Sequence, residues 1–401
     1  MVILKNAYYA QFLAETKSKR IICFGTGILF TEFIKYSQER IALLEKIDYI
    51  LDNNPAKKDA AIDLSPKLNL NKISITTVED LMQKKVVLSE YVIILTVFNE
   101  NIQSIISQLD NIPQFDNVSC YLGISALLWG REPSIVPLGT KSYLPKCKNE
   151  YNIPKVIHYC WFGCNKMTEI EKECIESWKK HCPDYEIKLW NEENYDISDK
   201  PLYVRQAYEA KKYAFVSDYA RLDIIYKHGG FYLDADVFLL KNLDDFINYK
   251  AVFAYSTCCE IATGLGFGSV ADNKIIKEHL DIYERILFVN GGELNLTPCP
   301  LYSTDYFSNK GIDINNRLHL NYDTLYLPSD FLCPIMSMPG EDGIWSLSLF
   351  ALTENSYAIH LCTYSWMEKD DLYKTFCEAK IKLGEINKRL LSDWQKCTKN
   401  A

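Results

Sequence analysis

Residues 214–240 read AFVSDYARLDIIYKHGGFYLDADVFLL, and this stretch decides the fold that the sequence predicts. Its first part predicts a helix, on which Asp218 and Arg221 share one face because they lie three positions apart. Gly229 and Gly230 follow, and paired glycines favour a left-handed helix C-cap and a tight reversal of the chain. The stretch therefore predicts a helix that stops at the glycines and turns back.

After the glycines, residues 231–237 predict a strand on which the period of two puts Asp234 and Asp236 on the same side. Two neighbouring carboxylates make a site for a hard divalent cation such as Mg²⁺ or Mn²⁺. With Asp218 and Arg221 alongside, the site suits a polyhydroxylated, phosphorylated ligand. A lone Asp-Ala-Asp would be an ordinary strand-end turn, so the prediction of a nucleotide-sugar site depends on its neighbours.

These neighbours follow a recognisable order, S-D-x-x-R at 217–221 and G-G-x-Y-L-D-x-D at 229–236. The order resembles the DXD-containing sugar-transferase family, which includes Och1-like mannosyltransferases, many capsular polysaccharide transferases and, distantly, the catalytic domains of clostridial glucosylating toxins. The resemblance implies a GT-A-like, Rossmann-type α/β domain with glycosyltransferase (hexosyltransferase) activity. It also implies that Asp218 and Arg221 contact the donor sugar, with Ser217 and Tyr232 close to the donor. The alternative for the first two residues is a helix-surface ion pair.

Composition limits the other classes of function. The 401 residues suffice for two or three domains, and a net charge of −8 disfavours nucleic acid as a partner. We expect no signal peptide and no transmembrane segment, because no apolar run approaches about 20 residues. The 14 cysteines form no CxxC pairs, which predicts reduced thiols in a bacterial-type cytoplasm, with peripheral contact at the inner face of the membrane left open.

The first 130 residues predict a separate, Rossmann-like accessory domain, because short strands alternate with helical stretches. The strands are expected at 20–24, 47–51, 73–75, 91–96 and 118–122, and the helices at 29–46, 78–82 and 99–109.

A partial dinucleotide fingerprint follows the first of these strands. Gly25 and Gly27 match the first two glycines of G-x-G-x-x-G, but Phe30 stands where the third is expected. Asp52 lies about where a ribose-binding acid would be. Nucleotide binding and a scaffolding role both remain open, and an NAD-dependent oxidoreductase would depend on this domain alone.

A linker is predicted at 131–152, followed by the transferase domain at 153–367. The segment 153–163, IPKVIHYCWFG, resembles the opening strand of the family. The resemblance makes Trp161 the platform for the nucleobase and puts His158 near it. The alternatives are a core aromatic for Trp161 and a core histidine for His158.

Two downstream segments bear on the same site. The loop 263–269, TGLGFGS, has three glycines that permit close approach of a ligand, and Cys299 replaces the glycine of the T-G-P turn in many relatives. The segment 358–366, AIHLCTYSW, resembles the closing element of the family.

By that resemblance, His360 completes the metal shell, and Ser365 and Trp366 bind the donor diphosphate. A structural histidine is the alternative for His360. The last predicted element is an amphipathic helix in 368–401, whose apolar stripe runs through 371–397 and suits packing on the catalytic domain or a homo-oligomer seam.

Together these features predict a metal-dependent, retaining glycosyltransferase that moves a hexose from a UDP-sugar, or from GDP-mannose, to a glycan acceptor in capsular or other surface polysaccharide. The metal site is expected to be Asp234, Asp236 and His360 with Mn²⁺ or Mg²⁺. The alternatives are a toxin-like protein glycosyltransferase and a non-catalytic nucleotide-sugar-binding protein.

Overall fold

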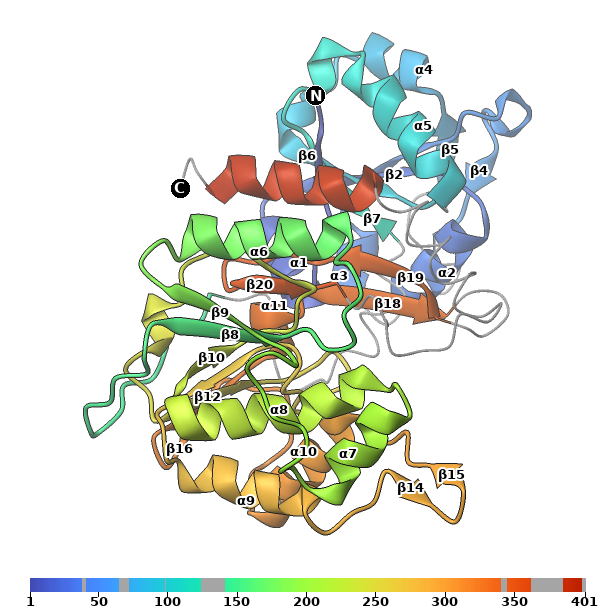
Figure 1. The fold of residues 1–401 in the computed structure, drawn as a ribbon. Coiled ribbons are helices and arrows are strands. Elements are labelled where there is room, and N and C mark those ends of the chain that lie inside the picture. Colours follow the sequence, from blue (N-terminus) through green and yellow to red (C-terminus); the bar gives the residue numbers. More distant parts are fainter. Residues whose placement is uncertain are drawn as a thin grey trace. The chain divides into compact units, whose positions relative to one another are not determined.

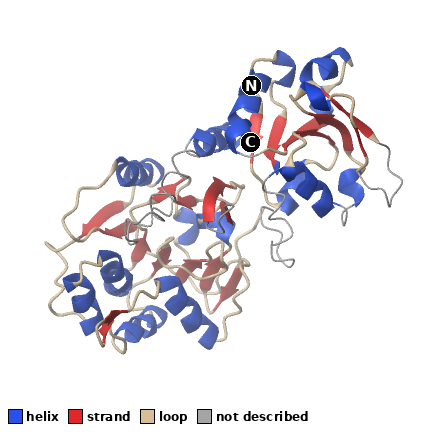
Figure 2. Cartoon of the chain, turned by 90° about the vertical axis from the view of Figure 1, so that its right-hand side faces the viewer, coloured by secondary structure: helices blue, strands red, loops and turns tan. Residues whose placement is uncertain are grey.

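The computed structural model divides the chain into two compact units (Figures 1 and 2). Unit 1 comprises Met1–Thr140, Ile335–Glu354 and Lys374–Ala401, and unit 2 comprises Lys141–Pro334 and Asn355–Tyr373. The predicted domains run continuously along the chain, whereas the structure returns two later segments to unit 1. The residues described are 1–37, 41–64, 72–97, 99–123, 141–339, 345–361 and 385–398.

Unit 1 contains a seven-stranded sheet in the order β1-β7-β6-β2-β3-β5-β4. All neighbouring strands are parallel except the β4–β5 pair at one edge. This arrangement confirms the α/β class that the alternating pattern predicts. The strands are β1 (Ile3–Lys5), β2 (Arg20–Phe24), β3 (Ile47–Leu51), β4 (Ala61–Ile62), β5 (Ile73–Thr76), β6 (Tyr91–Leu95) and β7 (Ser119–Leu122).

Both faces of this sheet are buried. On β2, Ile22 and Phe24 belong to one hydrophobic core, and Ile21 and Cys23 belong to the other. A strand buried on both faces requires helices on both sides, which explains its continuous apolar sequence. The α-helices of its first segment are α1 (Tyr9–Glu15), α2 (Ile28–Ser37), α3 (Ile41–Leu44), α4 (Val78–Gln83) and α5 (Asn99–Asp110).

Two elements at the start of unit 1, β1 and α1, were not predicted, and the single helix predicted at 29–46 is divided into α2 and α3. The strand β1 has only three residues, too few to show a period, and it is recognisable only through its pairing with β7.

A cavity of about 360 Å³ lies at the carboxyl ends of β2, β3 and β6, where the strand order reverses. Asp52 lines it and accepts hydrogen bonds from the backbone N–H groups of Thr26 (3.0 Å) and Asn54 (2.8 Å) and from Nζ of Lys57 (3.0 Å). Burial raises the pKa of Asp52, but these donors outweigh it and the pKa is lowered. The carboxylate is therefore already bound by several donors of its own unit.

The return segments complete unit 1. Residues 335–354 contain the antiparallel hairpin of β18 (Ile335–Pro339) and β19 (Trp345–Phe350). Residues 385–398 are helical, and Ile386 and Leu390 enter the core that also contains Phe24. The predicted packing of this helix on the catalytic domain is therefore wrong, because its described apolar side chains pack within unit 1. The remainder of the stripe, 371–384, lies outside the described residues.

A partly buried ion pair fixes this helix. Arg389 Nη1 lies 2.9 Å from Asp110, and its Nη2 donates to the carbonyl of Val2 at 2.6 Å. Asp393 accepts from the backbone N–H of Leu4 at 3.0 Å. The beginning and the end of the chain are thus joined within one unit.

Unit 2 contains a mixed seven-stranded sheet in the order β16-β17-β12-β13-β10-β8-β9. The β9–β8–β10 part is parallel, and β13 runs antiparallel to both of its neighbours. The strands are β8 (Val156–Cys160), β9 (Glu186–Trp190), β10 (Gly230–Tyr232), β12 (Ala251–Ala254), β13 (Phe267–Ser269), β16 (His319–Asn321) and β17 (Thr324–Leu327).

Helices α7 (Leu202–Glu209), α8 (Tyr213–His228), α9 (Lys274–Tyr283) and α10 (Cys299–Asn309) bury their apolar faces in a core that includes Phe215, Ile224, Phe253 and Phe267. Helix α6 begins with a capping box in which Thr168 and Glu171 satisfy the first backbone groups. None of the helices in the described parts of the chain is long and apolar enough to cross a membrane. The other helices of this unit are α6 (Glu169–His181) and α11 (Ser329–Leu332).

The described part of the predicted linker, residues 141–152, forms neither helix nor strand. It is nevertheless held to unit 2. Tyr249 donates its hydroxyl to the carbonyl of Pro145 at 2.6 Å, and Tyr151 donates to Asp323 at 3.0 Å.

Candidate active site

Helix α8 forms as the sequence predicts, and Asp218 and Arg221 are both buried on it, at 7% and 3% exposure. Gly229 is the C-cap of the helix, with φ 65° and ψ −167°. Its φ is positive as predicted, but its ψ is not that of a left-handed helical residue. Gly230 has φ 98°, and a Cβ there would lie 2.8 Å from the carbonyl oxygen of Val156. Both positions therefore require glycine.

The predicted strand at 231–237 is interrupted at the aspartates. Strand β10 ends at Tyr232, and the next strand, β11 (Val237–Leu239), begins directly after Asp236. Between them the chain turns, and the N–H of Val237 donates to the carbonyl of Asp234 at 3.0 Å. The two carboxylates are brought together by this turn and not by the alternation of one strand, which corrects the prediction.

The turn is held by two other segments. Strand β11 pairs antiparallel with β20 (Ala358–His360), with Val237 opposite His360, so a residue more than 120 positions away lies beside the aspartates. From helix α6, the indole of Trp178 donates to the carbonyl of Val237 at 2.7 Å. Trp178 therefore supports the turn from a helix that lies outside it in the sequence.

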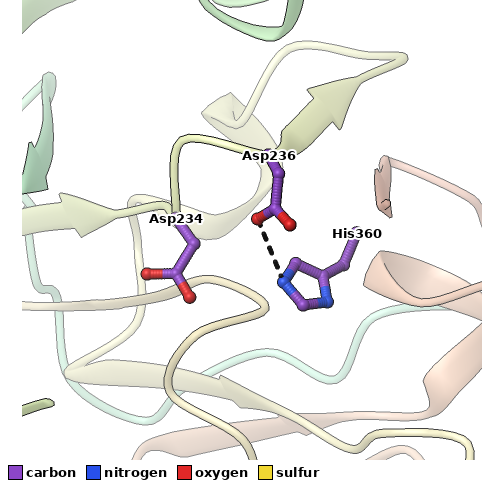
Figure 3. A group of neighbouring side chains, drawn as sticks. All are labelled: Asp234, Asp236 and His360. Carbon is purple, nitrogen blue, oxygen red and sulfur yellow. Dashed lines mark ion pairs between the residues drawn. The ribbon is translucent and has the colours of Figure 1, made fainter. Parts of the chain in front are cut away.

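Asp234, Asp236 and His360 form a group whose donor atoms all lie within 4.8 Å of one another (Figure 3). Nε2 of His360 lies 3.2 Å from Oδ1 of Asp236, and all three residues are partly buried. Two carboxylates and one imidazole suit a divalent cation such as Mn²⁺ better than Mg²⁺, which prefers an all-oxygen shell. The donor set therefore fits the metal that the sequence predicts.

Arg221 links this group to helix α8. One nitrogen of its guanidinium, Nη2, lies 3.1 Å from Oδ1 of both Asp218 and Asp234. Tyr232 donates its hydroxyl to the same oxygen of Asp234 at 2.9 Å. Both donors bind Oδ1, which leaves Oδ2 of Asp234 without a hydrogen bond from the described residues. Burial raises the pKa of Asp218 to about 6, although Arg221 opposes the rise.

Two further residues, Gly264 and Cys299, shape the site in a way that sequence reasoning missed. A Cβ at position 264 would lie 2.5 Å from Oδ2 of Asp234 and 3.1 Å from Nη1 of Arg221, so glycine leaves room for the carboxylate. Sγ of Cys299 accepts a hydrogen bond from Nη1 of Arg221 at 3.2 Å. The sequence marked both residues, the first as part of a glycine-rich loop and the second as a departure from the family pattern, without showing these contacts.

The substitution Gly264→Ala should lower turnover by roughly 10²-fold, because it must displace a carboxylate of the site by about an ångström. The control is Gly27→Ala, since a Cβ at that position meets nothing within 4 Å. Steady-state kinetics and thermal melting of both variants test this expectation. Equal turnover of Gly264→Ala and the wild type would contradict the geometry of the site.

Trp161, another predicted donor residue, lies at the carboxyl ends of the same strands. Trp161 directly follows β8, whose parallel neighbour β10 leads to Asp234, and its half-buried indole donates to the carbonyl of Asn165 at 2.6 Å. Ser217 is also half-buried, but its hydroxyl donates within helix α8, to the carbonyl of Tyr213 at 3.2 Å. Ser365 and Trp366 lie outside the described residues.

His158 matches its structural alternative. It is 1% exposed, its Nε2 lies 3.0 Å from the carbonyl oxygen of Gly229, and its Nδ1 accepts from the indole of Trp190 at 3.0 Å. These partners fit the neutral ring, because a proton on Nδ1 would face the N–H of Trp190. Burial lowers the pKa of His158 to about 4 from its ordinary 6.5, against the opposing hydrogen bond to Gly229.

Acid should therefore destabilise the fold through His158. Because the pKa of His158 is lowered in the folded state, the stability that comes from burying the neutral ring is fully present above pH 6.5. It is lost as the pH falls toward 4. The loss should amount to about 3 kcal/mol in the free energy of unfolding. Urea titrations between pH 4 and 7 should show a flatter dependence for His158→Gln than for the wild type. Parallel curves for the two proteins would contradict the assignment of a neutral histidine.

Comparisons with known proteins show similarities over part of the chain. Residues 168–253 match the family described as the glycosyltransferase sugar-binding region containing the DXD motif. The chain is 32% identical over 148 residues to inositol phosphoceramide mannosyltransferase 3 of Schizosaccharomyces pombe, covering 32% of this chain and 40% of that protein. The matched region is thus similar to the sugar-binding region of glycosyltransferases that contain a DXD motif.

Two further similarities are more limited. The chain is 27% identical over 120 residues to Subversion of eukaryotic traffic protein A of Legionella pneumophila, covering 23% of this chain and 18% of that protein. Among solved structures, it is similar to the PaToxG glycosyltransferase, with a TM-score of 0.33 and 22% identity, covering 40% of this chain and 71% of the other. The chain thus spans less than half the length of both curated relatives.

Proposed function

We propose that this protein is a metal-dependent glycosyltransferase that moves a hexose from a nucleoside-diphosphate sugar to a glycan acceptor. The observation that carries the proposal is the convergence of Asp234, Asp236 and His360 beside Arg221. Arg221 and both aspartates lie within the matched region, and His360 lies beside them through the pairing of β20 with β11. We propose a UDP-sugar as donor and surface polysaccharide synthesis in the cytoplasm as the setting. Unit 2 would be the GT-A-like catalytic domain, and the first part of unit 1 an accessory domain.

The metal would be held by Asp236, His360 and Oδ2 of Asp234. A bound Mn²⁺ or Mg²⁺ would supply Lewis-acid neutralisation of the diphosphate charge as the nucleotide leaves. The protein itself would orient the residues that hold the metal. Arg221 and Tyr232 both bind Oδ1 of Asp234, which fixes the orientation of that carboxylate.

On the donor side, we propose that Asp218 and Arg221 contact the sugar hydroxyls. Arg221 is almost wholly buried between two carboxylates, so its charge is retained and its fork of donors has a fixed direction. Trp161 would stack on the nucleobase, since it follows β8 at the same sheet edge as the aspartates and remains half-exposed. Ser217, Ser365 and Trp366 are retained as proposed donor contacts.

We propose retention of the anomeric configuration without a covalent glycosyl-enzyme. The carboxylate on α8 nearest the metal group, Asp218, is 7% exposed and paired with Arg221, which makes it a poor nucleophile. The departing phosphate would then assist attack on the same face of the sugar. The anomeric proton coupling of the product, measured by NMR, tests the stereochemistry.

The donor is tested with a panel of nucleotide sugars in the presence of Mn²⁺, following the released nucleotide. We expect one UDP-sugar to be turned over at least tenfold faster than the others. The substitution Trp161→Ala should have a larger effect on the KM for that donor than on the thermal stability of the protein. Release of nucleotide from none of the donors, by protein that melts cooperatively, would contradict the proposed function.

A further inference from the structure

A short hairpin in unit 2 presents a hydrophobic face to solvent. It is formed by β14 (Val289–Asn290) and β15 (Glu293–Leu294), joined by Gly291 and Gly292, which have φ values of 61° and 90°. A Cβ at either glycine would meet nothing within 4 Å, so the tip lies in open space. Figure 1 shows the hairpin extending away from the helices α7 and α10 of its unit.

The pairing register determines which side chains share a face. Val289 lies opposite Leu294, and the N–H of Asn295 donates to the carbonyl of Phe288 at 2.7 Å, which continues the ladder by one residue. The next pair is then Leu287 and Leu296. Because faces alternate along a strand, these two leucines lie on the same side as Val289 and Leu294.

We name the three exposed leucines of this side the hairpin face: Leu287, Leu294 and Leu296. Val289 is partly buried and packs against the core of unit 2. The three leucines are 42%, 40% and 47% exposed, whereas Phe288, on the opposite side, is wholly buried. The hairpin is therefore attached through Phe288 and Val289 and exposes its leucines.

Exposed hydrophobic side chains are concentrated at and beside this hairpin and are not evenly scattered over the surface. Of the twelve large hydrophobic side chains found exposed in the described parts of the chain, four lie between 287 and 301. The base is also fixed, because Oε1 of Gln206 on helix α7 accepts from the backbone N–H groups of Phe288 and Val289, both at 3.0 Å. The exposed leucines are therefore held on a fixed backbone.

We propose that the hairpin face docks on the surface of a lipid bilayer. Three leucines, each less than half exposed, offer far less apolar area than the roughly 800 Å² per partner that a stable protein interface requires. Residues 286–298 contain one charged residue, Glu293, and no lysine or arginine. Docking therefore depends on insertion of the leucines and not on attraction to anionic lipids.

The hairpin also leads directly to the candidate active site. Only Thr297 and Pro298 separate Leu296 from Cys299, whose Sγ accepts a hydrogen bond from Arg221. Docking would bring that site close to the bilayer surface, where the glycan of a membrane-anchored acceptor lies. This last step rests on the proposed function, whereas lipid docking itself does not.

The test is cosedimentation of the full chain with vesicles of pure phosphatidylcholine, without donor or metal, so that its outcome is independent of transferase activity. We expect binding that persists in 0.5 M NaCl and falls about tenfold or more in the double variant Leu294→Ser/Leu296→Ser. The matched control, Leu13→Ser/Ile170→Ser, removes two side chains of similar exposure, 42% and 44%, and should bind as the wild type does.

A second measurement excludes misfolding as the cause of lost vesicle binding. The substitution Leu294→Trp should give an emission that shifts to the blue when phosphatidylcholine vesicles are added, in protein with the wild-type melting temperature. Absence of vesicle binding by the wild type, equal binding of both double variants, or binding only to anionic vesicles at low salt would overturn the proposal. So would a concentration-dependent dimer that the Leu294→Ser/Leu296→Ser variant abolishes, because the face would then be an interface between copies.

Discussion

Replacing Asp236 by asparagine should lower kcat by about 10³-fold, equivalent to roughly 4 kcal/mol of transition-state stabilisation. The amide keeps the shape of the side chain but removes the charge, and Nε2 of His360 lies 3.2 Å from the carboxylate that would be lost. The turn should survive, because its backbone hydrogen bonds do not involve that side chain: the carbonyl of Asp236 still accepts from Leu361 at 2.9 Å. Kinetics at saturating donor and Mn²⁺ measure this effect.

The free energy of unfolding distinguishes a variant that has lost metal binding from one that has lost its structure. Asp236→Asn should unfold within about 1 kcal/mol of the wild type. The matched control is Asp305→Asn, an exposed aspartate on helix α10, which should change neither turnover nor stability. Wild-type turnover in Asp236→Asn would exclude Asp236 as a metal ligand.

Arg221→Ala should have the largest effect on stability, a loss of about 3–5 kcal/mol, because it leaves carboxylates without their buried partner. The side chain of Arg221 is 4% exposed, its guanidinium lies 3.1 Å from both Asp218 and Asp234, and it also donates to Cys299. Activity should be abolished as well. Denaturant unfolding, with the slope of the transition compared between variant and wild type, measures the effect.

Two variants sharpen this expectation. Arg221→Lys keeps the charge but not the planar fork, so it should retain more stability than Arg221→Ala while remaining inactive. Arg285→Ala, which removes an exposed arginine of the same unit, should change stability by no more than about 0.5 kcal/mol. A melting temperature of Arg221→Ala equal to that of the wild type would show that the buried ion pairs do not hold the site together.

Local sequence predicted the elements that depend on local contacts. The strands β2, β3 and β6 begin and end within one residue of their predicted bounds, and α8 places Asp218 and Arg221 on one face. In each case the period of apolar residues, or the spacing of two residues, carries the information. These features need no knowledge of the rest of the chain.

Features that depend on distant contacts were not predictable in the same way. The turn between β10 and β11 is fixed by the pairing of Val237 with His360 and by Trp178, which belong to separate segments. The need for glycine at 264 arises only when Asp234 lies against it. Likewise, the apolar stripe of the last helix was visible in sequence, but the core that buries Ile386 and Leu390 was not.

The pair of aspartates therefore gains its meaning from residues far along the chain, and the metal group they form with His360 is the centre of the proposed function. The most direct measurement is nucleotide release from the preferred donor before and after treatment with EDTA, followed by addition of Mn²⁺. We predict that chelation abolishes turnover and that Mn²⁺ restores it in the wild type but not in Asp236→Asn. Turnover that is unchanged by EDTA would contradict this account.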